Sequence, residues 1–428
     1  MKEEYIDTLI VGAGVAGMNC ALHLPAGMRA LVVCKGGLRE SDSFLAQGGI
    51  CVLHDRGDEQ SYFEDTMRAG HYENNPDTVR CMIRHSRETI EELIARGVRF
   101  EREANGELAY TREGAHSRPR IVFHADCTGK EISSHLLRAV QKLPNVILRP
   151  HTTMVDLLFD EAKTQCLGAI VRDNKTKELT AVHAGNTVLA TGGVGGLFPH
   201  STNFRILTGD GVGVALEHGI AVDHPEYVQF HPTTLYTQRR GRSFLISESV
   251  RGEGAQLINA AGERFVDELL PRDVVTAAIR REMRREGSRF VRLDLRTVAG
   301  GAQTLAHHFP GIVERCREEG YDVYSEPIPV VPAQHYFMGG VRSDLKGRTT
   351  MPHLYAVGET CCNGVHGKNR LASNSLLEAL IFARRAADDI AKGEFAEGRA
   401  VIPEQIYDKH TDYARHLRVK KEVDLEHE

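Results

Sequence analysis

The residues with the clearest chemical meaning form a glycine pattern near the start of the chain. Gly12-Ala13-Gly14-Val15-Ala16-Gly17 fits G-x-G-x-x-G and directly follows an apolar, strand-like run over residues 5–11. The first glycine makes a tight turn, the second lets the backbone approach a pyrophosphate, and the third lets the next helix pack on the strand. The helix N-terminus then offers free N–H groups to the anion. The pattern indicates a dinucleotide site, although a plain strand-to-helix turn can carry the same residues.

The residue that follows the second predicted strand favours one dinucleotide over another. Residues 30–34 are apolar, and they end about 20 residues after the glycines, where a carboxylate would bind the ribose of NAD. Lys35 occupies that position. The sequence therefore argues against a plain NAD site and favours FAD, with other segments completing the pocket.

Four side chains further along are donors of the kind that holds a dicarboxylate: His231, Arg272, His335 and Arg370. Arginine can grip a carboxylate with a forked pair of charge-assisted hydrogen bonds, which are about twice as strong as neutral ones. A single histidine or arginine is more often a surface or packing residue. Four of them, each within one of the sequence motifs described below, favour a substrate site.

The composition is that of an ordinary soluble globular protein, with 41% hydrophobic and 26% charged residues. A chain of 428 residues is long enough for two or three domains. Its formal net charge of −5 gives no reason to expect nucleic acid as a partner. We expect no membrane span, because no apolar stretch approaches the ~20 residues that a span needs. Nine cysteines without a C-x-x-C pair suggest neither a metal site nor disulfides, and they fit a reducing cytoplasm.

The elements that must position these residues can be read from hydrophobic periodicity. Residues 78–96 and 373–390 have helical spacing, and the second helix carries one apolar stripe. Short apolar runs within residues 146–182 predict a small antiparallel sheet inserted on the main one. Residues 187–189 predict a buried strand that ends on glycines. Residues 110–120 are polar and basic, so a solvated loop is the default interpretation.

Nine segments, taken in order, resemble the succinate dehydrogenase, fumarate reductase and L-aspartate oxidase family of flavoproteins. Any one segment could match by chance, but nine in order are very specific, and they span about residues 5–390. They are the glycine pattern above, Phe44-Leu45-Ala46-Gln47-Gly48-Gly49, Ala190-Thr191-Gly192-Gly193, Gln229-Phe230-His231-Pro232-Thr233, Arg251-Gly252-Glu253-Gly254, Pro271-Arg272-Asp273, His335-Tyr336-Phe337-Met338-Gly339-Gly340, Gly358-Glu359 and His366-Gly367-Lys368-Asn369-Arg370-Leu371-Ala372-Ser373-Asn374-Ser375-Leu376.

The resemblance implies an α/β fold: a Rossmann-type FAD-binding domain with an inserted α+β capping domain and a short or truncated C-terminal helical segment. The expected boundaries are 1–224 and 336–395 for the two parts of the FAD-binding domain, and 225–335 for the capping (substrate) domain. Residues 396–428 would start a C-terminal helical region, which family members usually extend into a bundle.

Two features favour the L-aspartate oxidase branch of this family. Subunits that feed quinone chains usually carry a histidine, bonded covalently to the flavin, five residues before Gln47, and here that position is Asp42. An aspartate cannot make that bond, so we expect non-covalent FAD. Residues 111–117, Thr-Arg-Glu-Gly-Ala-His-Ser, are similar to a segment whose glutamate, here Glu113, recognises the substrate ammonium. The plainer alternative is that Glu113 is only a loop carboxylate.

The resemblance also assigns roles around the substrate. His335 and Arg370 would bind the carboxylate next to the reacting carbon, while His231 and Ser247 would bind the distal one. The family usually has threonine at position 247, so serine keeps the donor and loses a methyl group. Ser373 would complete the substrate-binding set.

Arg272 resembles the residue that moves a proton to or from the substrate carbon. An arginine base is unusual because its pKa lies far above neutrality. It needs a desolvated site and a neighbouring acid, for which Glu248 and Asp273 are the two candidates. Glu248 also belongs to the expected substrate-binding residues.

The expected FAD site draws on all the glycine-rich segments. Its residues are Gly12, Ala13, Gly14, Val15, Ala16, Gly17, Lys35, Asp42, Ser43, Ala46, Gln47, Gly48, Gly49, Thr191, Gly192, Gly193, Asp210, Glu359, Ser375 and Leu376.

We hypothesise that L-aspartate docks between the two domains and that its Cα hydrogen passes to the flavin as hydride, giving iminoaspartate. Oxygen or fumarate would reoxidise the flavin, with fumarate becoming succinate in the same pocket. In the family the imine goes to quinolinate synthase, on the route to NAD. The alternatives are a fumarate reductase or succinate dehydrogenase subunit, and a nucleotide-binding protein without turnover.

Overall fold

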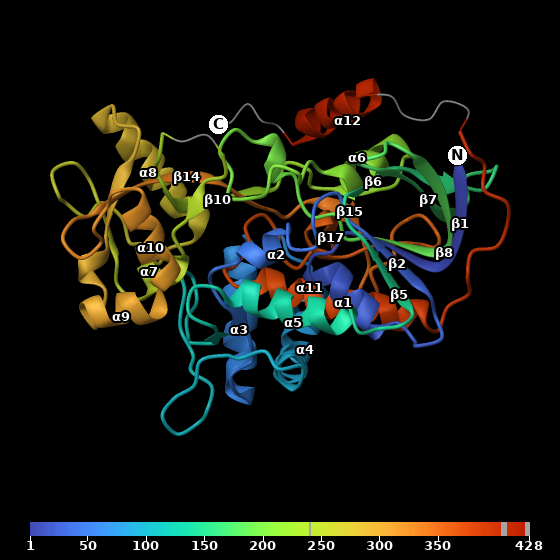
Figure 1. Ribbon diagram of the computed structural model, residues 1–428. Helices are drawn as coiled ribbons and strands as arrows, with labels where there is room; N and C mark the ends of the chain where they lie inside the picture. Colours follow the sequence, from blue (N-terminus) through green and yellow to red (C-terminus); the bar gives the residue numbers. More distant parts are fainter. Residues whose placement is uncertain (239–240, 404–408, 424–428) are drawn as a thin grey trace.

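A seven-stranded sheet forms the largest layer of the computed structural model, which describes residues 1–238, 241–403 and 409–423 (Figure 1). β7 (Cys166–Asp173) and β6 (Thr152–Phe159) form its antiparallel part, next to the first half of β8. Buried parallel strands are near-continuous apolar runs, and this explains the four fully buried residues of β2. The parallel strands lie in the order β5 (Val146–Arg149), β2 (Ala30–Val33), β1 (Lys2–Val11), β8 (Leu179–Leu189) and β16 (Leu354–Ala356). The predicted α/β class is confirmed.

The predicted small antiparallel sheet is present as β6, β7 and the first half of β8, but it is continuous with the main sheet, and residues 146–148 do not belong to it. β5 pairs with β2 in parallel, and residues 180–182 and 187–189 belong to one strand, β8, which pairs with β1 along nearly its whole length. The two halves of β8 look different in sequence because their outer neighbours differ. The first half lies beside β7 and alternates in burial, whereas the second half lies beside β16 and is fully buried.

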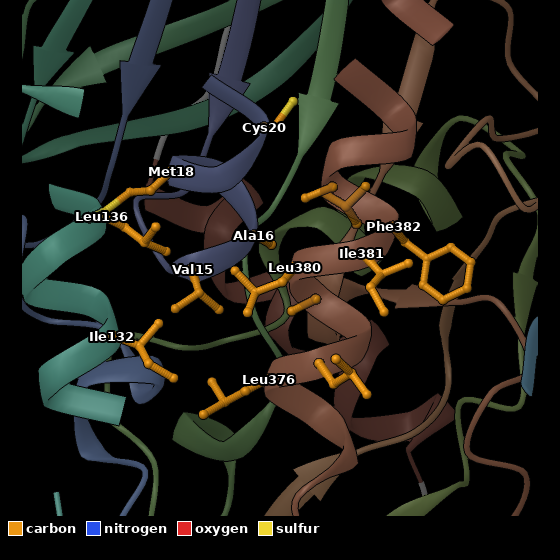
Figure 2. Close-up of a cluster of buried hydrophobic side chains, with 14 of the residues drawn as sticks. Val15, Ala16, Met18, Cys20, Ile132, Leu136, Leu376, Leu380, Ile381 and Phe382 are labelled. Atoms are coloured by element: carbon orange, nitrogen blue, oxygen red, sulfur yellow. The ribbon is translucent and has the colours of Figure 1, made fainter. Parts of the chain in front are cut away.

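Helices cover one face of this sheet and form its main core (Figure 1). Figure 2 shows Val15 and Met18 of α1 (Val15–His23) beside Ile132 and Leu136 of α5 (Thr128–Val140), with Leu380 of α11 (Asn374–Ile390) on the other side. The sequence predicted one apolar stripe on α11, but most of the surface of this helix is buried. Two further helices flank this layer, α3 (Glu59–Ala69) and α4 (Pro76–Ala95).

A second, antiparallel sheet with its own core forms the lobe drawn in yellow and orange in Figure 1. Its strands lie in the order β11 (Phe244–Leu245), β10 (Val228–Leu235), β14 (Ile328–Phe337), β13 (Val291–Asp294) and β12 (Gln256–Ile258). Its helices are α7 (Glu248–Gly252), α8 (Arg272–Glu286), α9 (Gly301–His308) and α10 (Pro310–Glu318). This lobe falls largely within the expected capping domain, whose boundaries at 225 and 335 stay a prediction.

Several further elements are short. They are α2 (Asp42–Leu45), the pair β3 (Ile50–Cys51) and β4 (Ile121–Val122), the sheet of β17 (Cys361–Cys362), β15 (Gly340–Arg342) and β9 (Val222–Asp223), and the 3₁₀ turns η1 (Arg56–Asp58), η2 (Gly195–Leu197), η3 (Leu295–Thr297) and η4 (Gly358–Thr360). Across the described residues, no helix is both long and apolar enough to cross a bilayer.

The described part of the C-terminal region ends in a helix on the far side of the sheet (Figure 1). α12 (Lys409–Glu422) packs on α6 (Asp210–Glu217) through the buried Val419. Arg415 adds an ion pair with Glu217, with a shortest N–O distance of 2.5 Å. Residues 404–408 and 424–428 of the predicted helical region 396–428 lie outside the described residues.

The default interpretation of residues 110–120 as a solvated loop is wrong in part. Arg112, Arg118 and Pro119 are exposed, but Glu113, His116 and Arg120 are buried. Arg120 is 0% exposed and is one of the largest fully buried side chains. Its guanidinium forks onto Asp58, with Nη2–Oδ1 at 2.9 Å and Nε–Oδ2 at 3.0 Å, and Nη1 donates to Asp65 Oδ2 at 2.7 Å. Buried charges are tolerated when they are paired and hydrogen-bonded in this way. Spacing alone cannot reveal these partners, which lie 55 and 62 residues away.

The same guanidinium fixes His116 and so ties the loop to a distant segment. Arg120 Nη1 donates to His116 Nδ1 at 2.9 Å, which leaves the ring proton on Nε2. Nε2 then donates to the carbonyl oxygen of Ala372 at 3.1 Å. Burial and the charge of Arg120 lower the pKa of His116 to about 4, so the ring is neutral at physiological pH.

Replacing Arg120 by alanine should lower the free energy of unfolding by about 3–5 kcal/mol, because Asp58 and Asp65 would stay buried without their cation. Urea unfolding of the FAD-saturated protein measures this change. Burial alone would raise the pKa of both aspartates, but hydrogen bonds from Arg120, and from Ser117 to Asp65, bring each pKa below its ordinary value. The loss of unfolding free energy caused by Arg120→Ala should therefore become smaller as the pH falls below about 4, because the two carboxyls become neutral.

Arg118→Ala is the matched control, because this nearby arginine is exposed. It should change the unfolding free energy by less than about 0.5 kcal/mol. Equal effects of the two substitutions would contradict a structural role for the buried guanidinium.

Candidate active site

One cavity runs between the two lobes, and almost every predicted site residue lines it. The exceptions are Gly17 and Gly193, which lie directly behind the wall. A Cβ on Gly17 would come within 1.9 Å of the Gly12 carbonyl oxygen, as expected for a glycine that lets a helix pack on a strand. A Cβ on Gly193 would come within 2.4 Å of Glu359 Oε1, so this glycine makes room for a side chain that does line the cavity.

The glycine turn after β1 has the backbone that its pattern predicts. Gly12 has φ of 123°, a region that favours glycine, and a Cβ there would lie 1.9 Å from the carbonyl oxygen of Ala190. Gly14 is the N-cap of α1 and gives it no side-chain cap. The helix N-terminus therefore faces the cavity with backbone donors, as a pyrophosphate requires.

Polar side chains around this turn fit the sugar and phosphate parts of FAD. Ser41 Oγ, Asp42 Oδ2 and Gln47 Oε1 are buried, line the cavity and have no hydrogen-bond partner within the described protein. Such groups need a partner, and the hydroxyls of a ribityl chain can supply one. Lys35 lies at the same cavity, where Nζ pairs with Asp210 Oδ2 at 3.0 Å.

Two carboxyl groups in the cofactor part of the cavity resist ionisation. Burial raises the pKa of Asp42 to about 7, and burial together with the Asp42 charge raises the pKa of Glu359 to about 8. Each still accepts one backbone hydrogen bond, Asp42 from Phe204 at 2.9 Å and Glu359 from Phe337 at 3.0 Å. A protonated carboxyl at neutral pH can donate to an uncharged ligand oxygen.

His231 reaches the cavity because β10 is irregular there. The register of β10 against β14 shifts between His231 and Thr234, around Pro232, which cannot donate to the ladder. His231 Nδ1 lies 3.1 Å from both the amide nitrogen and the carbonyl oxygen of Thr233, so it has a backbone partner in either tautomer, and Nε2 is buried without a partner in the described protein. Burial and the charge of Arg272 hold the pKa of His231 well below its usual value, so the ring is neutral.

The other predicted carboxylate ligands lie on the neighbouring wall. Thr202 Oγ1 lies 2.8 Å from His335 Nδ1, and the rings of His335 and His231 meet edge to face at 5.0 Å. Arg370 lies over the ring of Tyr336 at 4.4 Å and keeps a buried Nε with no partner among the described residues. Burial and the neighbouring arginine lower the pKa of Arg370 to about 10, so it remains a cation at neutral pH.

Arg272 is held from behind by two side chains. Its Nε donates to Glu248 Oε2 at 2.5 Å, and its Nη1 donates to Gln229 Oε1 at 2.8 Å. Glu248 is shared with Arg251, whose Nη2 lies 3.4 Å from the same oxygen. The geometry therefore selects Glu248 as the acid beside Arg272, because Asp273 points to His71 at 2.9 Å on the exposed side. Burial opposes ionisation of Glu248, but the two guanidiniums bring its pKa below the usual range.

Glu113 is a buried carboxylate at the same cavity, 2% exposed, and is not a plain loop carboxylate. Ser249 Oγ donates to its Oε1 at 2.7 Å, and Ser373 Oγ donates to its Oε2 at 2.6 Å. Ser373 does so from a left-handed backbone with φ of 62°, which costs an L-residue on the order of 1 kcal/mol or more. Burial and the Glu248 charge raise the pKa of Glu113 above its ordinary value, despite the two hydroxyls and Arg272.

The family model described as "FAD binding domain" matches residues 7–376 of this chain. The chain is 49% identical, over 385 residues, to an L-aspartate oxidase of Clostridium perfringens, and the match covers 90% of this chain and 86% of that protein. A second L-aspartate oxidase, from Clostridium acetobutylicum, is 45% identical over 90% of this chain and 87% of its own length. This chain belongs to the L-aspartate oxidase family.

A solved structure with the same arrangement is a variant of the E. coli quinol fumarate reductase. It has a TM-score of 0.85 and 29% sequence identity, and the match covers 98% of this chain and 74% of that one. The fold and the FAD-binding assignment of this L-aspartate oxidase family member are therefore confirmed. The roles of individual site residues stay predictions.

Sequence reasoning missed four polar residues of this L-aspartate oxidase family member that contact predicted ones. Gln229 holds Arg272, Arg251 shares Glu248, Thr202 contacts His335, and Ser249 contacts Glu113. Gln229, Arg251 and Ser249 lie within or beside recognised motifs, and this proximity was the available signal. Thr202 lies outside those motifs, so only the fold brings it to the site.

Proposed function

We propose that this protein oxidises L-aspartate to iminoaspartate, with oxygen or fumarate as electron acceptor. One observation supports the choice of substrate above the others: the buried carboxylate of Glu113 lies at the same cavity as the carboxylate donors His231, His335 and Arg370. A plain diacid brings no cation that could pair directly with this carboxylate, and an unpaired charge is costly in a buried site. An amino diacid brings an ammonium group that can pair with it.

The proposed binding mode assigns one set of donors to each end of the substrate. The neutral Nε2–H of His231 and the hydroxyl of Ser247 bind the distal carboxylate, while His335 and Arg370 bind the carboxylate next to the reacting carbon. Three neutral donors and the Arg370 cation suit two carboxylates on a molecule whose own ammonium is paired with Glu113. Fixing both ends aligns the Cα–H bond, and proximity of this kind supplies a large share of the rate.

The residues around the glycine turn would hold FAD, which would supply the acceptor for the hydride and, with it, for both electrons that leave the substrate. The chain itself holds and moves protons. For fumarate reduction we propose that Arg272 gives a proton to the substrate carbon and that Glu248, at 2.5 Å, restores it. Arg251 keeps Glu248 ionised so that it can accept the next proton.

We propose that FAD is held without a covalent bond. Asp42 stands where the resemblance places the flavin-linking histidine, and a carboxylate does not form that bond. Acid precipitation of the purified protein should therefore release all the yellow colour into the supernatant. Colour that stays with the pellet would contradict this assignment.

The instability of the product limits its fate in the cell. Iminoaspartate is an imine that water hydrolyses, so a consuming enzyme must take it promptly. We propose quinolinate synthase for this role, on the route to NAD, as in the family. All nine cysteines are free, which suits a reducing compartment such as the cytoplasm.

Anaerobic mixing of the FAD-loaded protein with substrate tests the proposed function directly. L-aspartate should bleach the visible absorbance of the flavin, and succinate at the same concentration should do so at least roughly tenfold more slowly, because it offers Glu113 no cation. Stopped-flow spectroscopy measures both rates. Rapid reduction of a quinone dye by succinate, with no bleaching by aspartate, would instead identify a succinate dehydrogenase or fumarate reductase subunit.

Glu113→Gln should lower kcat/KM for aspartate roughly 10- to 100-fold, mainly through KM, since an amide cannot pair with the ammonium as a carboxylate does. The loss for fumarate reduction should be clearly smaller. Steady-state assays of both reactions on one preparation give the comparison. Glu107→Gln, at an exposed glutamate, is the control and should leave both reactions unchanged. If Glu113→Gln lowered kcat/KM equally for aspartate and for fumarate, Glu113 would not be the residue that binds the substrate ammonium.

A further inference from the structure

Ser249 stands in a chain of hydroxyls that joins the two ends of the proposed substrate site. Ser247 Oγ donates to Ser249 Oγ at 3.2 Å, and Ser249 Oγ donates to Glu113 Oε1 at 2.7 Å. The Ser249 side chain is buried, with 7% of the residue exposed. Ser249 does not line the cavity, whereas Ser247 and Glu113 do. It therefore acts on the site through its neighbours.

Each serine hydroxyl has a single proton, and this decides what substrate binding can change. In the absence of substrate the Ser247 proton points to Ser249. When a distal carboxylate arrives, Ser247 must turn its proton to that carboxylate. The Ser249 proton stays on Glu113 in both states, because Glu113 is its only anionic partner among the described residues.

Glu113 needs this support because its surroundings disfavour its charge. Ser373 holds the other oxygen, Oε2, at 2.6 Å. The charged and titratable groups that act on Glu113 come from three directions: Glu248 and Arg251 of α7, Arg272 of α8, and Cys51 of β3. Burial and the Glu248 charge raise the pKa of Glu113, while the hydroxyls of Ser373 and Ser249 and the charge of Arg272 lower it.

We propose that Ser249 is a specificity-determining positioning residue, which keeps Glu113 ionised and aimed into the cavity so that an amino diacid is preferred over a plain diacid. This inference rests on the proposed function and extends it to a residue that does not touch substrate. Two consequences separate it from a merely structural role: the preference between substrates and the pH at which that preference is lost.

The pH dependence follows from the charge of Glu113. When Glu113 is protonated, the aspartate ammonium loses its partner, so the half-saturation concentration for aspartate rises as the pH falls through the raised pKa of Glu113. Removing the Ser249 hydroxyl removes one of the interactions that lower this pKa. As the pH is lowered, the half-saturation concentration for aspartate should therefore begin to rise at a higher pH in Ser249→Ala than in the native protein.

The experiment compares Ser249→Ala, Ser249→Thr and the native protein, each loaded with FAD. Anaerobic flavin reduction at several aspartate concentrations and pH values gives the half-saturation concentration, and a reduced-dye assay gives kcat/KM for fumarate. We expect Ser249→Ala to lower kcat/KM for aspartate roughly tenfold at neutral pH, as loss of a hydrogen bond to a charged group implies. Its effect on fumarate should be less than about threefold. Ser249→Thr keeps the hydroxyl and should restore most of the loss.

Ser133→Ala is the matched control, because Ser133 is a buried serine of α5 whose hydroxyl has no partner among the described residues. It should leave both reactions unchanged. Equal losses for aspartate and fumarate in Ser249→Ala, or an unshifted pH dependence, would overturn the inference. Failure of aspartate to bleach the native protein is a separate outcome, visible before any variant is made, and it would refute the proposed function together with the role of Glu113.

Discussion

A balance of buried charges at the junction of the two lobes is the constraint on which the site depends. Glu113 and Glu248 are neighbouring carboxylates, each almost fully buried, and such a pair is stable only beside cations. Arg272 and Arg251 provide them. Glu113 comes from the lobe of the large sheet and the other three residues come from the second lobe, and the Ser249 hydroxyl links Glu113 to that second lobe.

This balance explains why the carboxylate donors differ in charge. The arginines stay charged, and burial together with their fields keeps His231 and His335 neutral. Neutral N–H donors add hydrogen bonds without adding positive charge to a crowded site. The cavity thereby suits a molecule with two carboxylates and one ammonium group. FAD would lie along the wall that the glycine turn forms.

A second buried network keeps the Glu113 loop in place. Arg120 binds two aspartates and fixes His116, whose ring donates to the carbonyl oxygen of Ala372, next to Ser373. Ser373 in turn reaches Glu113 from a left-handed backbone. Strain of this kind persists only where the surroundings hold it, and it is often found at functional sites. The orientation of Glu113 is thus set by contacts well outside the cavity.

Most of the fold and of the cofactor site could be predicted from the chain because their signals are local. The glycine pattern, the buried strand after it and the helical periodicity of residues 78–96 each fit within a short window. A short stretch of sequence was not enough for β8. Its two halves differ in burial because the first lies beside β7 and the second beside β16, so one strand was predicted as two.

The sequence by itself determined the glycine turn for FAD, the α/β class and the set of cations and carboxyls available for a four-carbon diacid, because these follow from residue type and short spacing. Only the tertiary structure decided that Glu113, His116 and Arg120 of the segment 110–120 are buried, that Glu248 and not Asp273 accompanies Arg272, and that Ser249 supports Glu113. The physical reason is that burial and hydrogen bonding are properties of contacts, and Ser249 and Ser373 lie 136 and 260 residues from Glu113 along the chain. No local pattern carries that information.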